Sequence, residues 1–311
     1  MLRKDKEQIV RRRIAAWYRK HRRELQWRFT TDPYEILVSE IMLQQTQVSR
    51  VIGKLPTFLA TFPNFGRLAS ARRSDVLRAW KGMGYNNRAV RLHEMAQTVA
   101  EQFNGTLPDT VDALLALPGI GKYTAHAVLC FAYRKRVPVV DVNIIRVYSR
   151  VFHRMKSPGE YRSIDAMWET AHRMLPRNAY DWNQALMDLG ATICTARAPQ
   201  CGRCPLADLC ASRSALAKVG SAKTSGSSAV RKPEPSYAGV PRRIWRGRIV
   251  DALRHADASR GLPLATLGRK TKMDFSANDI PWLKTMTGLL AADGVVRIEQ
   301  RRSTSYVSLV D

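Results

Sequence analysis

The stretch Leu117-Pro-Gly-Ile-Gly-Lys-Tyr-Thr124, followed by an apolar run and then Val137-Pro-Val-Val-Asp-Val-Asn143, decides the fold. Before it, Thr110 can cap a short helix that Pro118 ends. Gly119 and Gly121 allow positive φ and close backbone approach, and a second helix is predicted over residues 123–133. The first amides of that helix could hold a phosphate. A Gly-x-Gly turn alone is equally typical of an ordinary tight turn.

The chain is strongly basic. Its 311 residues contain 51 Lys and Arg against 26 Asp and Glu, for a formal charge of +25 and a pI near 10.5. A polyanion is therefore the expected partner, with an acidic membrane surface as the competing interpretation. No run of eighteen apolar residues occurs, and the first residues lack the apolar core of a signal peptide. We expect no membrane contact and a cytoplasmic location, associated with the nucleoid in a prokaryote.

Three regions differ in composition. Residues 1–212 show helical periodicity and little strand alternation, which predicts a mainly α domain. Residues 213–240 are basic and rich in Ser, Lys and Pro, as in a flexible linker. Residues 241–311 predict a small winged-helix-like module, with helices over 244–255, near Leu264 and over 279–292, and a hairpin of 295–298 with 306–309. Arg301 and Arg302 in its wing favour DNA binding, although a solvated charge run is an equal alternative.

Four of the five cysteines lie within seventeen residues. Cys194, Cys201, Cys204 and Cys210 have the spacing C-x6-C-x2-C-x5-C. Four thiolates suit a [4Fe–4S] cluster or a tetrahedral zinc ion. Zinc ribbons usually show two C-x-x-C pairs, and this loop has one, so the spacing favours the cluster. Cys130 lies in an apolar helix and is expected in the core.

Seven sequence blocks together resemble the helix-hairpin-helix DNA glycosylase superfamily and, within it, the MutY-type adenine glycosylases. Besides the cysteine loop, they are Leu25–Arg28, Ile36–Val48, Trp80–Tyr85, Leu117–Thr124, Val140–Asn143 and Asn183–Gly190. The blocks stand in the family's order over roughly residues 8–212. The resemblance implies a two-lobed glycosylase fold with an iron–sulfur loop over residues 194–210, acting as a monomer on double-stranded DNA with a mispaired or damaged base.

Two carboxylates carry the chemistry that the resemblance implies. Glu40 would lie in the base pocket, where burial raises a carboxyl pKa and keeps a proton available for a purine nitrogen. Asp141 would stabilise the oxocarbenium-like sugar, directly or through a transient covalent intermediate, with Asn143 orienting it. Without the resemblance, Glu40 could belong to a solvated helix face. Asp141 could be only a helix cap, and capping and catalysis are compatible.

Tyr123 indicates the reaction type. Relatives that also cut the strand carry a lysine at this position for a Schiff base with the sugar. Lys122 is adjacent, but one residue turns about 100° around a helix, so its amine should face the phosphate side. We therefore expect a monofunctional glycosylase. A packing role for Tyr123 is the alternative.

The resemblance assigns further residues to DNA. Trp27, Arg28 and Gln184 would line the pocket of the extruded base, while Gln44, Gln45 and Tyr85 would insert beside or stack on the unpaired partner. Core packing is the alternative for Trp27 and Tyr85. Backbone phosphates would meet Gly119, Gly121, Lys122, Arg197 and Arg203.

The chain departs from the family in three places. The region after residue 240 is too short for the Nudix-like domain with which many MutY proteins recognise 8-oxoguanine. Tyr85-Asn86-Asn87 replaces a frequent Tyr-Tyr pair, and Ile145 stands where lysine is common. We expect removal of adenine opposite 8-oxoguanine or guanine. A thymine or uracil glycosylase for G·T and G·U mismatches and a noncatalytic DNA-binding protein are the alternatives.

Overall fold

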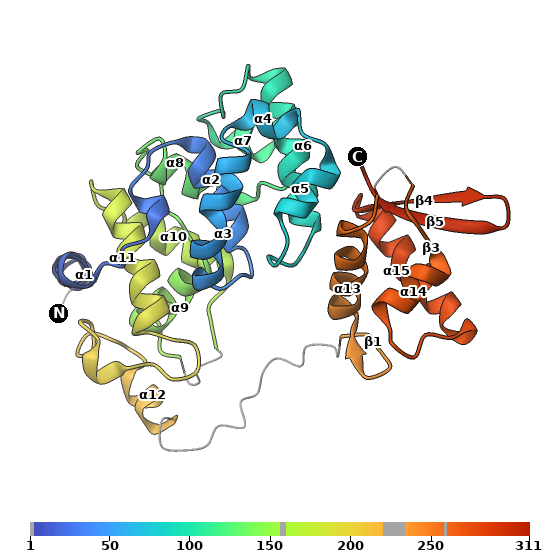
Figure 1. Cartoon of the computed structure of the whole chain (residues 1–311). Coiled ribbons are helices and arrows are strands. Elements are labelled where there is room, and N and C mark those ends of the chain that lie inside the picture. The colour runs from blue at the N-terminus through green and yellow to red at the C-terminus, as the bar shows by residue number, and fades with distance from the viewer. Residues whose placement is uncertain (1–2, 156–159, 220–233, 258–259) are drawn as a thin grey trace. The chain divides into compact units, whose positions relative to one another are not determined.

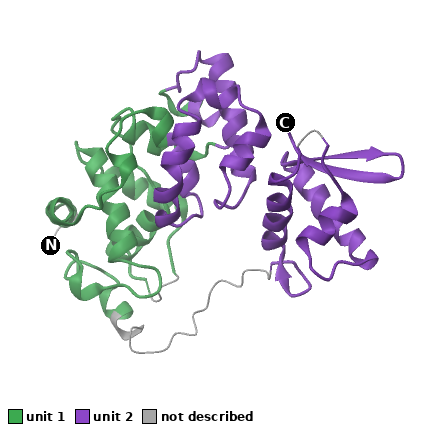
Figure 2. Ribbon diagram, viewed as in Figure 1, with its two compact units in different colours: residues 1–36, 109–112, 120–231 green, residues 37–108, 113–119, 232–311 purple. Residues whose placement is uncertain are grey.

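The computed structural model describes residues 3–155, 160–219, 234–257 and 260–311, and its fold is mainly helical, as expected. The chain forms two compact units, coloured separately in Figure 2. Unit 1 comprises residues 1–36, 109–112 and 120–231, and unit 2 comprises residues 37–108, 113–119 and 232–311. Both the N-terminal half and the C-terminal module therefore contribute to unit 2.

Unit 1 is built around two packed helices, α9 (Val142–Phe152) and α11 (Ala179–Thr192), and α1 (Arg3–His21) covers α11. Its core includes Ile14, Tyr148 and Leu186, each at most 1% exposed. Side-chain caps begin three of its helices: Asp141 for α9, Ser163 for α10 (Ile164–Met174) and Asn178 for α11. The remaining elements are η1 (Gln26–Arg28), α8 (Lys122–Phe131), η2 (Cys201–Arg203) and α12 (Arg213–Val219).

In unit 2, helices α4 (Phe65–Ala69) and α5 (Arg73–Ala79) pack on the long helix α6 (Asn87–Gln102), as Figure 1 shows. The fully buried residues Leu37, Phe58, Trp80 and Leu92 belong to this core. Phe58 and Trp80 meet edge to face at 5.8 Å between ring centroids. Three further helices are α2 (Pro33–Leu43), α3 (Val48–Thr61) and α7 (Val111–Leu115), and the boundary between the units falls within α2 and α7.

The C-terminal module has the element order predicted for a winged helix (Figure 1). Strands β3 (Leu262–Pro263), β5 (Thr304–Leu309) and β4 (Val296–Arg301) form an antiparallel sheet in that order, with Ile298 opposite Val307. Helices α13 (Arg242–Arg254), α14 (Leu264–Thr271) and α15 (Ile280–Ala292) pack with it, and η3 (Ala277–Asp279) precedes α15. A stack of Tyr237 on Trp282, with ring centroids 4.4 Å apart, joins the leading hairpin β1 (Ser236–Tyr237) and β2 (Val240–Pro241) to α15.

The predicted linker over residues 213–240 contains local structure at both ends. Helix α12 occupies residues 213–219, and the β1–β2 hairpin begins at residue 236. Residues 220–233, its middle, lie outside the described residues. Among the helices of the described residues, none combines the length and apolar character that crossing a membrane requires.

Candidate active site and DNA-contacting elements

Asp141 is held firmly at the N-terminus of α9. Its Oδ1 accepts a 2.7 Å hydrogen bond from the backbone N of Ile144, and its Oδ2 accepts one of 2.6 Å from Nδ2 of Asn143. Burial raises the pKa of Asp141 above its ordinary value, while these two donors and the charge of Arg146 act in the opposite direction. The side chain is thus a helix cap whose orientation is fixed, which suits a carboxylate that must face a developing positive charge.

Two residues that the sequence did not single out hold Asn143. Oδ1 of Asn143 accepts a 2.7 Å hydrogen bond from Nη2 of buried Arg146, which also donates to the carbonyl of Gly190 at 2.6 Å. A Cβ added to Gly190 would lie 2.7 Å from Cβ of Asn143. Only glycine therefore lets α11 approach the start of α9 so closely.

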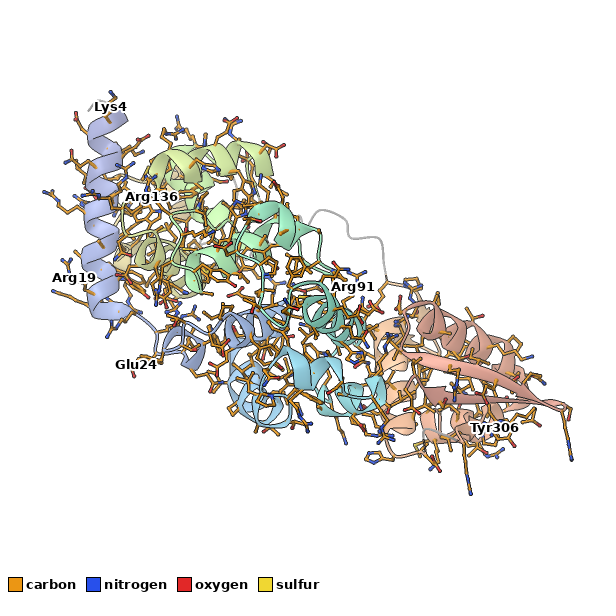
Figure 3. All side chains as sticks on the ribbon, turned by 90° about the horizontal axis from the view of Figure 1, so that it is seen from above. Lys4, Arg19, Glu24, Arg91, Arg136 and Tyr306 are labelled. Carbon is orange, nitrogen blue, oxygen red and sulfur yellow. The ribbon has the colours of Figure 1, made fainter. Side chains whose placement is uncertain are left out.

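The hairpin has the predicted helices on both sides, α7 and α8. Gly119 has φ +80°, in the left-handed region, and an added Cβ would meet Arg91, labelled in Figure 3, at 3.1 Å. Gly121 does not use the positive φ that glycine allows: its φ is −103°, and it precedes α8 with nothing within 4 Å of an added Cβ. Glycine at this position therefore does not relieve backbone strain. Because it has no side chain, the start of α8 stays open to an approaching group.

Lys122 and Tyr123 form the first turn of α8. Lys122 is exposed, and its Nζ lies 4.2 Å from the ring centroid of Trp168. This cation–π contact holds the ammonium group of Lys122 beside the Trp168 ring. The resemblance to the glycosylase family places the same group near a DNA phosphate. Tyr123 is half-buried.

Glu40 is 5% exposed on α2, flanked by the buried residues Ser39 and Ile41. The helix ends at Leu43, so Gln44 and Gln45 form the turn that follows it. Gln45 is exposed and has φ +55°, a conformation that a non-glycine residue adopts only when its surroundings enforce it. Tyr85, 48% exposed with φ +44°, is a second residue of this kind in unit 2.

Arg88 hydrogen-bonds to the backbone of both turns, and no sequence pattern singled this residue out. Its Nη1 donates to the carbonyl oxygens of Ile41 and Gln44 at 2.8 and 2.5 Å, and its Nη2 donates to those of Met83 and Gly84 at 2.9 and 3.2 Å. Burial lowers the pKa of Arg88 to about 10, so it remains charged at neutral pH. One buried guanidinium thus fixes the backbone on which Gln45 and Tyr85 stand.

Arg28 is engaged by a carboxylate that the sequence did not assign a role. Nη1 and Nη2 of Arg28 form a bidentate pair with Asp188, both bonds 2.8 Å long, and Nε of Arg23 reaches Asp188 at 2.6 Å. Burial favours a raised pKa for Asp188, but the hydrogen bonds and charges of Arg28 and Arg23 together outweigh burial and hold the pKa below its ordinary value. This pair anchors the segment carrying Trp27, which is buried, to α11, the helix that also carries buried Gln184.

The four clustered cysteines line one cavity in unit 1. Its other walls are mainly apolar and include Val147, Leu189 and Ile193. Within the described residues, no three Cys, His, Asp or Glu side chains converge as ligands of a single ion would, and the sulfurs stand around the cavity. A [4Fe–4S] cluster takes one thiolate on each of four irons, so this donor set in an apolar cavity fits such a cluster.

The cysteine loop is anchored from α9. Arg150, fully buried, donates from Nη1 to the carbonyl of Thr195 at 2.7 Å and from Nη2 to that of Ala196 at 2.9 Å. Arg197 and Arg203 are exposed on the same loop, and Nη1 of Arg203 donates to Oε1 of Gln200 at 2.8 Å. Both arginines are thus available to an external anion.

Comparison with known families matches two stretches of the chain, one that includes residues of both units and one within unit 1. Residues 38–171 match the HhH-GPD superfamily of base excision DNA repair proteins. Residues 194–210 match the iron–sulfur binding domain of endonuclease III, so the four cysteines form a [4Fe–4S] site.

Several curated proteins are similar over most of the chain. An adenine DNA glycosylase of Mycobacterium tuberculosis is 44% identical over 247 residues, covering 78% of each chain, and one of Mycolicibacterium smegmatis is 43% identical. Because 78% of 311 residues is about 243, the first similarity extends past Cys210. A thymine-DNA glycosylase of Aeropyrum pernix is 36% identical over 212 residues, covering 67% of this chain and 95% of its own.

Solved structures agree with this family. The structure of a thermostable thymine-DNA glycosylase has a TM-score of 0.63 at 34% identity and covers 69% of this chain and 98% of its own. A non-covalent endonuclease III–DNA complex has a TM-score of 0.61 at 20% identity, covering 70% and 100%, and shares the fold. The chain therefore belongs to the HhH-GPD superfamily of base excision DNA repair proteins and, within it, to the MutY-type adenine DNA glycosylases.

Proposed function

We propose that this protein removes adenine mispaired with 8-oxoguanine or guanine by hydrolysing the N-glycosidic bond, and leaves an uncut abasic strand. The observation that carries the proposal is the carboxylate of Asp141, held by Asn143 and the Ile144 amide at the N-terminus of α9. The similarity to an adenine DNA glycosylase covers 78% of the chain and extends beyond Cys210, which supports adenine as the base.

In this mechanism the two carboxylates have different tasks. Glu40, buried on α2, protonates a ring nitrogen of adenine and makes the base a better leaving group. Asp141 remains ionised and stabilises the positive sugar as the bond breaks, with Asn143 keeping its orientation. Water then adds to C1′ of the sugar and gives its proton to the carboxylate left on Glu40, which restores the acid. Because Tyr123 supplies no amine, no Schiff base forms and the strand is left intact.

The remaining site residues bind and extrude the nucleotide. Gln45 and Tyr85 fill the gap and contact the unpaired partner base, with Gln44 supporting them, while Trp27, Arg28 and Gln184 surround the adenine. Gly119, Gly121 and Lys122 hold the backbone. When bound, the [4Fe–4S] cluster crosslinks the loop of residues 194–210, and Arg197 and Arg203 on that loop contact phosphates. We propose that the enzyme works as a monomer on double-stranded DNA, in the cytoplasm at the nucleoid of a prokaryote.

A substrate panel separates this proposal from its alternatives. Duplexes with A opposite 8-oxoguanine, A·G, G·T and G·U are incubated at a stated salt concentration, then treated with alkali to reveal abasic sites. Cleavage of the two adenine duplexes supports the proposal. Cleavage of G·T and G·U only would favour the second candidate, a thymine or uracil glycosylase, which the similarity to such enzymes motivates. No cleavage of any duplex would favour a binding protein.

The monofunctional reaction has its own test. Sodium borohydride reduces a Schiff base between enzyme and sugar to a stable crosslink, so a lyase is trapped on DNA. We expect no crosslink with the wild type and a crosslink when Tyr123→Lys supplies the amine. Strong trapping of the wild type would overturn the monofunctional assignment.

A further inference from the structure

The C-terminal module reaches the turn that carries Tyr85 through one buried arginine. Arg254, the last residue of α13, has a side chain only 6% exposed. Its Nε donates to the carbonyl oxygen of Leu77 at 3.1 Å, and its Nη2 donates to Oδ1 of Asn86 at 3.0 Å. Its Nη1 pairs with Asp251 on the same helix. Arg254 thus bonds to two points of the N-terminal part of unit 2.

Those two points stand at either end of the turn. Leu77 belongs to α5, and Asn86 immediately precedes α6, where its carbonyl accepts hydrogen bonds from the amides of Ala89 and Val90 at 3.0 and 3.3 Å. Between them, Gly82, Gly84 and Tyr85 all have positive φ, of 87°, 68° and 44°. For Tyr85 this left-handed conformation is strained, so neighbouring contacts must hold it.

The interior of the turn is also held. Nε1 of Trp80 donates to the carbonyl of Gly84 at 3.1 Å, and Arg88 of α6 donates to the carbonyls of Met83 and Gly84. To these contacts and to the packing of α5 on α6, Arg254 adds a hydrogen-bonded link between the two ends. A planar guanidinium suits that task because its donors point in fixed, divergent directions.

We infer that Arg254 is a positioning residue by which the C-terminal module keeps the Tyr85 turn in the conformation that meets DNA. The effect on catalysis rests on the proposed function, but the hydrogen bonds of Arg254 do not depend on it. It gives the module a role inside the glycosylase.

The test is a double-mutant cycle. Arg254→Ala and Asn86→Ala are each expected to slow single-turnover excision about tenfold. The double variant should be no slower than Arg254→Ala alone, because that change already removes the bond to Asn86. Arg254→Lys should also be slow, since one ammonium cannot span both acceptors. The matched control is Ser74→Ala, which removes the 2.7 Å bond from Ser74 Oγ to Oδ1 of Asp311 elsewhere between the module and α5, and should keep the wild-type rate.

A second measurement works even if the wild type excises nothing. Amide hydrogen exchange in the peptide spanning residues 80–88 reports the order of the turn directly. We expect faster exchange there in Arg254→Ala and Asn86→Ala but not in Ser74→Ala. Unchanged exchange in Arg254→Ala, effects that add fully in the double variant, or equal slowing by Ser74→Ala would each overturn the inference. An inactive wild type with the expected exchange pattern would overturn only the proposed function.

Discussion

At the scale of single residues, the site depends on how each charged group is held. Asp141 keeps two hydrogen bonds at 2.6 and 2.7 Å, although burial raises its pKa. Arg88 and Asp188 are almost fully buried and bind backbone carbonyls and arginines respectively. A few charges taken out of water therefore determine the geometry, and removing a partner from any of them should have a large effect.

The first residue-scale prediction concerns pH. Asp141 must be ionised, so excision should decline as pH falls through its pKa, which is raised above the usual value for Asp. Asn143→Ala removes a donor that lowers this pKa, so the acid limb of the single-turnover rate should move to higher pH. Asn178→Ala removes an asparagine that caps α11 and should leave that limb in place. An acid limb unmoved in Asn143→Ala would contradict this account of Asp141.

The second residue-scale prediction concerns Arg88. Arg88→Ala removes the guanidinium donors from the carbonyl oxygens of the Gln44 and Gly84 turns, and should lower the free energy of unfolding by about 2–4 kcal/mol. Arg88→Lys should retain part of the stability yet slow excision about tenfold, because a single ammonium cannot hold both turns. Denaturant titration and single-turnover rates measure these effects. Arg67→Ala, at an exposed arginine of α4, should change neither.

At the scale of elements, the close approach of α11 to α9 sets the position of Asp141. Gly190→Ala would bring a methyl group within 2.7 Å of Cβ of Asn143 and push the start of α9 away. We expect a loss of about 1–3 kcal/mol in the free energy of unfolding and at least about a tenfold slower excision.

The control for this prediction is Gly53→Ala in α3, where an added Cβ meets nothing within 4 Å. It should be neutral or slightly stabilising, because alanine has the higher helix propensity. Should both glycine variants behave alike, the helix contact could not be what positions Asp141.

At the scale of the whole molecule, a charge of +25 makes phosphate contacts the main source of affinity. Plots of log Kd against log salt should be steep. Arg197→Gln and Arg203→Gln, on the cysteine loop, should each reduce the slope by about one. Arg12→Gln makes the same charge change on an exposed position of α1 and should leave the slope unaltered. If all three variants gave the same slope, the cysteine loop would not be part of the surface that contacts DNA.

Local patterns were sufficient to predict the mainly helical fold, the hairpin flanked by helices, the winged-helix order and the cap at Asp141. Each depends on residues close in sequence, such as Asp141 and Ile144. The partners Arg88 with Gln44, Asp188 with Arg28 and Arg254 with Asn86 are 44, 160 and 168 residues apart, so no local pattern contains them. A local pattern can also leave a conformation open: glycine permits positive φ but does not require it, and Gly121 has φ −103°.

The most direct test of the central claim is single-turnover excision of adenine opposite 8-oxoguanine by the wild type and by Asp141→Asn. Asparagine keeps an oxygen that can accept from the Ile144 amide, so the cap on α9 survives while the charge is lost. We predict excision by the wild type, and for the variant DNA affinity within about threefold of the wild type with excision slowed at least about a hundredfold. A variant that excises adenine at the wild-type rate, or a wild type that leaves this duplex intact, would contradict the account.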